Sequence, residues 1–178
     1  MPSYTYGEPT RSNDGKNDYQ FVGWDDNGDG VVDNTSPSRT ITVDKTYDIK
    51  AIFKPALKTV SVKANNGTYG TVQVSQGSNK GSSIQAEYGS NVQLLASSKD
   101  AVKYLFSKWS NNATQASTTV TVKEDTTYEA IFITNTYTVN FYNGNSKVHT
   151  TTVIRGSSID SSRSSVGSST SIPPITGV

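Results

Sequence analysis

The chain has 178 residues, a formal net charge of +1 and no cysteine. The near balance of charge excludes the basic stripe of a nucleic-acid-binding surface, and the lack of cysteine excludes disulfides and thiolate chemistry. No apolar run approaches the roughly 18 residues of a membrane helix, so membrane insertion is not expected. The opening residues "MPSYTYGEPT" have neither the basic region nor the apolar core of a signal peptide. Abundant Thr, Ser, Asn, Gly and Tyr predict a mainly β protein with many turns.

Two aromatic strand motifs dominate the first 54 residues, and an acidic loop separates them. "YQFVGW" at residues 19–24 ends in Trp24, and "TITVDKTYDIKAIFK" occupies residues 40–54. The sequence "DDNGDGVVD" follows Trp24 directly. A calcium loop places oxygen ligands at positions 1, 3, 5, 7, 9 and 12, and glycine at position 6. Counted from the first aspartate of the loop, the candidate metal ligands are Asp25, Asn27, Asp29 and Asp33.

The same loop also fits a turn without a metal. Position 12 of the calcium pattern is Ser36, which offers no bidentate carboxylate, and Pro37 follows where an EF-hand would begin its exit helix. The four aspartates of residues 25–33 repel one another unless a counter-charge lies nearby. The alternatives are therefore a looser Ca²⁺ site and a solvated turn whose Asn and Gly residues adopt positive φ. Calcium is the only cofactor that the sequence suggests.

Residues 55–133 contain a longer series of predicted strands. "TVSV" and "TVQV" alternate in polarity, and the Asn-Gly pair between them predicts a hairpin turn. "NVQLLA" follows Tyr88-Gly89, and "TTVTV" and "TYEAIF" flank the polar turn "KEDT". In "KDAVKYLFSKW" helical spacing competes with a strand, and we favour a strand ending in Trp after one helical turn at residues 99–103. The residues expected to anchor the core of this segment are Phe106, Trp109, Ile131 and Phe132.

The last part of the chain begins with a strand pattern and ends in a polar tail. "YTVNFYNGNSKVHTTTVIRGSSI" at residues 137–159 resembles residues 58–78 in its opening strand, and its "RGSSI" takes the place of "YGSNV". Residues 161–178 are Ser-rich with two prolines, which predicts a flexible linker or tail. The ending "IPPITGV" resembles a sortase signal only at three positions and is interpreted as linker: Pro174, Thr176 and Gly177.

These motifs recur, so the chain is an array of repeats. Residues 40–54 align without a gap with residues 119–133, and "YQFVGW" aligns with "YLFSKW" at residues 104–109. The offset is 85 residues at the Tyr and 79 at the Thr, so the first copy has about six extra residues after its Trp. "TYGEP" at residues 5–9 is interpreted as the first copy of the Tyr88-Gly89 element. Four aromatic residues recur in register, as core residues do in repeats: Trp24, Phe53, Trp109 and Phe132.

The motifs resemble the B-repeat of internalin-type surface proteins and its divergent relatives. The likeness rests on the order of Tyr88-Gly89, Phe106–Trp109, Thr119–Val122 and Ala130–Phe132, and it covers roughly residues 4–159. The resemblance implies small β-grasp-like or β-sandwich-like modules in tandem, forming an elongated array within exported, mostly Gram-positive, bacterial proteins. It also implies stalk, spacer or adhesive roles, and it brings no catalytic residues with it.

The repeat pattern predicts the domain boundaries. Residues 1–54 are expected to be the C-terminal part of a first repeat, residues 55–133 a complete divergent repeat, and residues 134–160 the opening hairpin of a third. A module of about 75 residues is small for one core, so neighbouring repeats are expected to help bury it. The permuted boundaries also suggest head-to-tail self-association, in which the hairpin of one molecule completes the half-repeat of another.

Ligand binding and catalysis have little support in the sequence. Exposed tyrosines could stack on a glycan or contact a host protein, and the candidates are Tyr4, Tyr6, Tyr69 and Tyr142. His149 is the only histidine, and no acid partner or nucleophile elbow accompanies it, so an enzyme is not expected. Lys63 and the asparagines lack the Glu-flanked pattern of an isopeptide bond.

The expected function is a non-catalytic, tandem-repeat segment of a secreted or cell-surface bacterial protein, acting as a stalk or spacer and in part as an adhesive module. The alternative is a carbohydrate-binding or host-protein-binding module that uses exposed tyrosines and strand edges. In either case the export signal and the anchor are expected to lie outside this chain.

Overall fold

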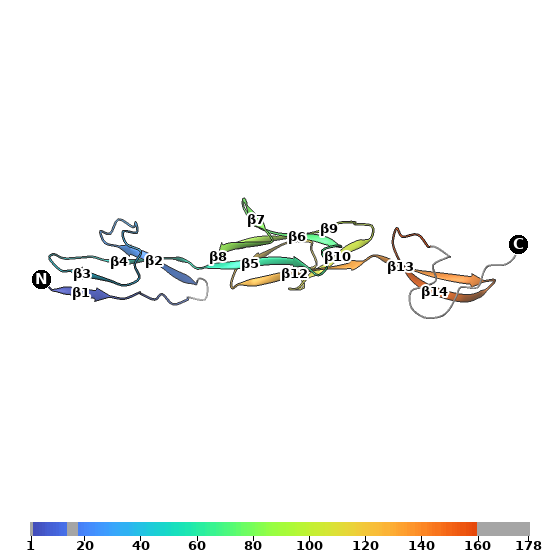
Figure 1. The fold of residues 1–178 in the computed structure, drawn as a ribbon, viewed down its shortest axis with the longest axis horizontal. Coiled ribbons are helices and arrows are strands. Elements are labelled where there is room, and N and C mark those ends of the chain that lie inside the picture. The colour runs from blue at the N-terminus through green and yellow to red at the C-terminus, as the bar shows by residue number, and fades with distance from the viewer. Residues whose placement is uncertain (1, 14–17, 160–178) are drawn as a thin grey trace. The chain divides into compact units, whose positions relative to one another are not determined.

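The computed structural model describes residues 2–13 and 18–159 of the chain (Figure 1). These residues form strands, turns and irregular segments, and within them no helix is long and apolar enough to cross a membrane. The prediction of a mainly β protein is confirmed, and the several small sheets fit tandem β modules. The Ser-rich segment 161–178, with Pro174, Thr176 and Gly177, lies outside the described residues.

The chain divides into two compact units. The first unit comprises Met1–Val62, Gln73–Leu95 and Ser117–Tyr128. The second unit comprises Lys63–Val72, Ala96–Ala116 and Glu129–Val178. Each unit collects segments that are distant in sequence, because its strands pair with partners from other parts of the chain.

Two small antiparallel sheets form near the N-terminus. Their strands are β1 (Ser3–Tyr6), β2 (Tyr19–Asp25), β3 (Arg39–Thr42) and β4 (Lys50–Pro55). β1 pairs with β3, and β2 pairs with β4. In the second sheet Phe21 lies opposite Phe53 and Trp24 lies opposite Ala51, with a bulge between Phe21 and Gly23. The Thr, Tyr and Ile side chains of these segments suit a pleated, half-buried surface.

The middle of the chain forms two four-stranded sheets. One has the order β10 (Tyr104–Trp109), β12 (Thr126–Thr134), β5 (Leu57–Ala64) and β8 (Ser83–Glu87). The other has the order β11 (Ser117–Thr121), β9 (Asn91–Ser98), β6 (Gly70–Gln76) and β7 (Asn79–Gly81). Gly70 of β6 lies against the ring of Phe132 of β12, so closely that an added Cβ would overlap the ring. The two sheets therefore pack directly on each other at this point.

The predicted hairpin between "TVSV" and "TVQV" is wrong, because β5 and β6 belong to different sheets. Asn65, directly after β5, accounts for the separation. Its backbone N–H donates to the carbonyl of Ala130 at 2.9 Å, and its Nδ2 donates to the carbonyl of Phe132 at 3.0 Å. Its Oδ1 accepts from the N–H of Phe132 at 2.9 Å. These bonds fasten the end of β5 to β12, so the Asn-Gly pair makes a connection between sheets.

The segment of ambiguous periodicity is a strand, as favoured from the sequence, and the single turn predicted before it is present. Residues 99–103 form a hydrogen-bonded turn in which the N–H of Tyr104 donates to the carbonyl of Asp100 at 2.8 Å. Asp100 Oδ1 also accepts from the N–H of Val102 at 3.0 Å. From Tyr104 onward the residues pair with β12 as strand β10, so the turn does not continue into a helix.

The core residues predicted for the complete repeat are confirmed in part. Trp109 and Phe132 are the largest fully buried side chains among the described residues. Phe106 and Ile131 are only half-buried. Phe106 lies on β10, the outer strand of its sheet, and Ile131 points to the face opposite Phe132 because neighbouring strand residues alternate. In the first copy Trp24 is buried and Phe53 is half-buried.

The hairpin predicted near the C-terminus is confirmed. β13 (Thr136–Asn143) pairs antiparallel with β14 (Ser146–Ile154), and Gly144 in the turn adopts a φ of 60°. Val139 and Phe141 on β13 are half-buried.

Strand register shows that β1–β4 repeat β9–β12. Phe21 faces Phe53 as Phe106 faces Phe132, and the bulge falls after the same residue in both pairs. Likewise, the pairing of β1 with β3 repeats that of β9 with β11, which places Tyr6 at the position of Leu94. The proposed equivalence of "TYGEP" with Tyr88-Gly89 is therefore wrong, because that element precedes β9 whereas Tyr6 ends β1.

Candidate functional site

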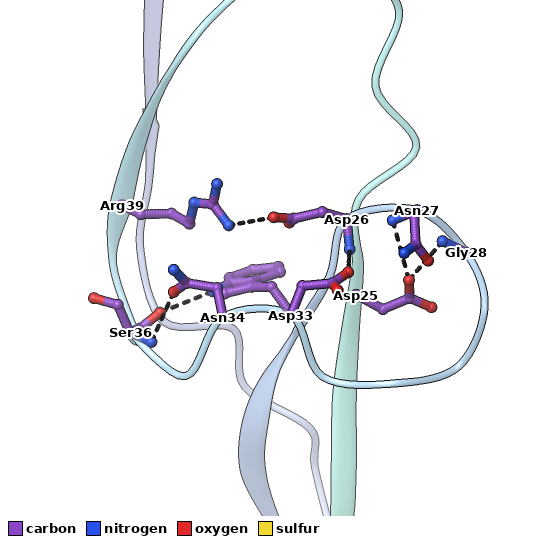
Figure 2. Close-up of polar contacts among 9 residues, drawn as sticks. Asp25, Asp26, Asn27, Gly28, Asp33, Asn34, Ser36 and Arg39 are labelled. Atoms are coloured by element: carbon purple, nitrogen blue, oxygen red, sulfur yellow. Dashed lines mark hydrogen bonds and ion pairs between the residues drawn. The ribbon is translucent and has the colours of Figure 1, made fainter.

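The acidic loop is closed at its base by backbone hydrogen bonds. The N–H of Trp24 donates to the carbonyl of Asn34 at 2.7 Å, and the N–H of Asp33 donates to the carbonyl of Trp24 at 2.8 Å. The loop thus leaves the end of β2, and at its far end Asn34 pairs with Trp24 (Figure 2). In addition, Trp24 Nε1 donates to the carbonyl of Ser36, two residues beyond the closing pair, at 3.0 Å, so the indole has a hydrogen-bond partner.

Asp25 organises the interior of the loop. It is buried, with 1% of its surface exposed. Its Oδ1 accepts from the N–H groups of Asn27 at 3.2 Å and Gly28 at 2.5 Å, and its Oδ2 accepts from the N–H of Gly30 at 3.0 Å. Burial alone would raise the pKa of Asp25, but these three N–H groups and the charge of Lys50 outweigh it and hold the pKa below its ordinary value.

Further side chains cap the loop in the same manner. Asn27 Oδ1 accepts from the N–H of Asp29 at 2.9 Å, and Asp29 Oδ1 accepts from the N–H of Val31 at 2.8 Å. Asp33 Oδ2 accepts from the N–H of Asp26 at 2.8 Å. Side chains that bond to backbone two residues on are typical of Asx turns. Two glycines of the loop adopt the positive φ expected for a turn, at 82° and 84°: Gly28 and Gly30.

The loop has the counter-charges that its aspartates require. Arg39 of β3 places Nη1 2.6 Å from Asp26 Oδ2, and both side chains are half-buried. The bond to Asp26 raises the pKa of Arg39, against the opposing effect of burial. Lys50 of β4 approaches Gly28. Repulsion among the carboxylates is therefore offset by two cations that come from neighbouring strands.

Calcium binding by Asp25, Asn27, Asp29 and Asp33 stays a prediction. These residues supply the carboxylate and amide oxygens that Ca²⁺ prefers, and the three N–H donors on Asp25 leave it further lone pairs. However, in residues 2–13 and 18–159 no three His, Cys, Asp or Glu side chains gather in a group that could hold a metal. Calorimetric titration with Ca²⁺ distinguishes the two interpretations: binding heat and a raised melting temperature support a site, and neither effect supports a turn.

One residue beside the loop was missed by the sequence reasoning. Gly23 is buried, and a Cβ at this position would overlap the side chain of Val32 and the backbone of Asn34. The register-equivalent residue in the complete repeat is Lys108, which is exposed. The glycine in "FVGW" therefore belongs with the inserted loop, and the difference between "FVGW" and "FSKW" was the signal that could have revealed it.

The four tyrosine candidates lie in different surroundings. Tyr4 is 64% exposed on β1, and Tyr142 is 60% exposed on β13. Tyr6 packs edge-on against Trp24, with ring centroids 4.5 Å apart, and burial raises its pKa. Tyr69 stacks on Tyr104 at 4.3 Å. Of the four, Tyr4 and Tyr142 have rings that are mostly open to solvent.

The remaining polar candidates make ordinary contacts. His149 on β14 lies beside the ring of Phe141, with centroids 5.7 Å apart. Lys63 forms an ion pair with Glu129 at 3.4 Å. These are cross-strand contacts of the kind that stabilise sheets.

A comparison with known families identifies the family to which the repeats belong. A family model described as "Divergent InlB B-repeat domain" matches residues 14–57 and again residues 60–136. Searches of curated proteins and of solved structures found no match to the chain. The family is one of non-catalytic structural repeats, typical of bacterial surface proteins. The two matched segments together span most of the chain, which belongs to the divergent InlB B-repeat family.

Proposed function

We propose that this chain is a stalk or spacer segment of a bacterial secreted or cell-surface protein. The observation that supports it is the repetition of one scaffold. The Phe-Trp motif of β2 and the Ala-Ile-Phe motif of β4 recur in β10 and β12 with the same register and the same bulge. A repeated core with variable surface loops is suited to setting distance, because its length can change by whole modules.

The spacer role is tested by changing the number of modules. Chains with one, two and three copies of residues 55–133 are compared by small-angle X-ray scattering. A spacer increases its maximum dimension by a constant step for each added copy. An unchanged dimension, or a collapse to a compact particle, contradicts the proposal.

A binding role is the second candidate, and the exposure of two aromatic rings favours it. Tyr4 and Tyr142 offer flat apolar faces to solvent, and such rings are common at recognition surfaces. A glycan array and a panel of host matrix proteins test this role directly. A ligand whose binding is lost in Tyr4→Ala or Tyr142→Ala, and kept in the partly covered control Tyr69→Ala, supports it. No binding to any array member leaves the spacer role alone.

A further inference from the structure

The complete repeat begins and ends on neighbouring strands of one sheet. β5 is its first strand and β12 is its last, and the two are hydrogen-bonded neighbours in the order β10, β12, β5, β8. Contacts between them advance along both strands together. The N–H of Thr59 donates to Asp125 Oδ1 at 2.6 Å, and four residues further along both segments Lys63 forms its ion pair with Glu129. The two strands are therefore parallel.

The connections on either side of the repeat contain no spacer. One residue, Ala56, separates β4 from β5, and one residue, Asn135, separates β12 from β13. Each of them is also bonded to the residue that precedes a neighbouring strand. The N–H of Ala56 donates to the carbonyl of Asp18 at 2.7 Å, and the N–H of Asn135 donates to the carbonyl of Lys103 at 2.7 Å. Tension along the chain therefore reaches the ends of β5 and β12 without slack to be taken up first.

Such tension loads the β5–β12 pair lengthwise. The force acts on the first residue of β5 and on the last residue of β12, and because the strands are parallel these two points lie at opposite ends of the pair. Pulling them apart slides one strand along the other, so the hydrogen bonds between the strands must stretch together. A force on the same end of both strands would instead break the bonds one after another. Each bond alone is weak, so the sharing of the load decides the resistance.

Side chains of the two strands also oppose sliding. At the far end of the pair, the amide of Asn65 both donates to and accepts from the backbone of Phe132. The buried side chains of the pair are Val60 and Val62 on β5, and Ala130 and Phe132 on β12. A slip of one residue would bring the side chains of one strand out of register with the buried face of the other. Sliding therefore costs apolar burial as well as hydrogen bonds.

We propose that the complete repeat is a load-bearing module, in which the β5–β12 pair resists tension along the chain. The inference rests on the proposed stalk role and extends it from setting a distance to transmitting a force. Forced unfolding is governed by the rate of unfolding. The resistance therefore depends on how the force meets this pair, and not on the equilibrium stability of the repeat alone.

Single-molecule pulling of the full chain in two geometries tests the proposal. The chain has no cysteine, so handles attached to two introduced cysteines define where the force acts. The double variant L57C/T136C pulls β5 and β12 from opposite ends, as tension along the chain does. The control L57C/E124C pulls both strands from the same end, and all three positions are exposed. We expect an unfolding force about threefold higher in the first geometry, because several hydrogen bonds then break together.

A substitution at the far end of the pair separates resistance to sliding from a general loss of stability. Asn65→Ala removes both side-chain bonds to Phe132, so it should lower the unfolding force in the first geometry. It should leave the force in the control geometry unchanged, because that pull opens the pair from its other end. The matched control is Asn66→Ala, which removes a bond to the N–H of Thr68 and none to β12, and which should change neither force.

Circular dichroism first verifies that each variant folds as the unmodified chain does. Equal unfolding forces in the two geometries would overturn the proposal, and so would an equal loss of force in both geometries for Asn65→Ala. The stalk role is tested separately by scattering. A constant step in length for each added copy, together with equal forces, would leave the spacer role standing and remove the load-bearing one. A higher force in the first geometry, lowered there alone by Asn65→Ala, is the result that supports it.

Discussion

The loops after the two tryptophans show how one scaffold accepts two different connections. After Trp109 the chain returns at once: the N–H of Trp109 donates to the carbonyl of Ala113 at 2.8 Å, across three intervening residues. After Trp24 the equivalent bond to Asn34 spans the nine residues 25–33. The closing bond is the same in both, and the six-residue difference predicted from the sequence lies wholly inside the loop.

The longer loop contains a buried side chain, that of Asp25, whereas residues 110–112 of the shorter loop are all exposed. Asp25 is buried under the amides of its own loop, and the carbonyl of Ser36 satisfies the indole of Trp24. In the complete repeat the buried Nε1 of Trp109 has no hydrogen-bond partner among the described residues. In this chain the inserted loop bonds the buried carboxylate of Asp25 to its own backbone, and β2 keeps the register against β4 that β10 has against β12. Four sets of substitutions test this comparison.

The largest effect is expected from the tryptophan at the centre of each copy. Trp109→Ala should destabilise the complete repeat by about 3–5 kcal/mol, because the indole is fully buried and its loss leaves a cavity. Trp24→Ala should cost less, since Trp24 is 8% exposed and its neighbours Ala51 and Phe53 are only half-buried. Chemical denaturation of the two variants measures both values. Equal losses of unfolding free energy would show that the two tryptophans stabilise their copies equally, despite their different burial.

Exchanging the residue before each tryptophan should have an asymmetric effect. Gly23→Lys forces a side chain into Val32 and Asn34, and it should cost about 1–3 kcal/mol. The reverse change, Lys108→Gly, should cost only about 0.5–1 kcal/mol, from the entropy of glycine in a strand. Replacing residues 25–33 with residues 110–112 should restore the stability of Gly23→Lys. No rescue by the short loop would show that Gly23 serves the strand itself.

A smaller and pH-dependent effect is expected at Asp25. Asp25→Ala leaves three loop N–H groups without an acceptor, so the melting temperature should fall at neutral pH. Because the folded pKa of Asp25 is lowered, its contribution is present above the unfolded value of about 3.9 and is lost as pH falls through the folded value. The variant and the unmodified chain should therefore converge in melting temperature at strongly acidic pH. A constant difference across pH would exclude a role for the charge.

The smallest effect is expected at the ion pair that ties the loop to β3. Arg39→Gln should cost about 0.5–1 kcal/mol, and the cost should shrink in high salt, since the pair lies near the surface. Asp26→Asn should give a similar value, and the double variant should lose no more than either one. Thermal melts at low and high salt provide the measurement. Additive losses would mean that the two side chains act independently.

The sequence predicted what depends on repetition and on residue alternation. The recurring Trp and Phe positions, the offset of six residues and the strand pattern of β9 to β12 all follow from aligned motifs. It failed at Asn66-Gly67, because an Asn-Gly pair indicates a turn but not which strands the turn separates. The side chain of Asn65, whose bonds to Phe132 decide the matter, carries no recognisable local pattern.

The interior of the acidic loop was predictable in kind but not in detail. The Asp, Asn and Gly residues predicted either a turn or a metal-binding loop, because both need tight bends with glycine at positive φ. The cation for Asp26 comes from Arg39, thirteen residues away, and the space for the loop comes from Gly23. Contacts of this kind depend on how strands are placed side by side, which one sequence does not reveal.

The same backbone hydrogen bond closes the turn after each tryptophan, whatever the length of the turn. This turn is therefore a suitable site for the insertion of foreign peptides. Extending the turn from three to nine residues costs roughly 1 kcal/mol in loop-closure entropy, a small fraction of what the core around each tryptophan supplies. Gly23, which has no side chain, leaves the space beside β2 that the longer loop occupies. An engineered display scaffold could therefore carry a binding epitope between Trp109 and Ala113, with Lys108 changed to Gly to make room beneath it.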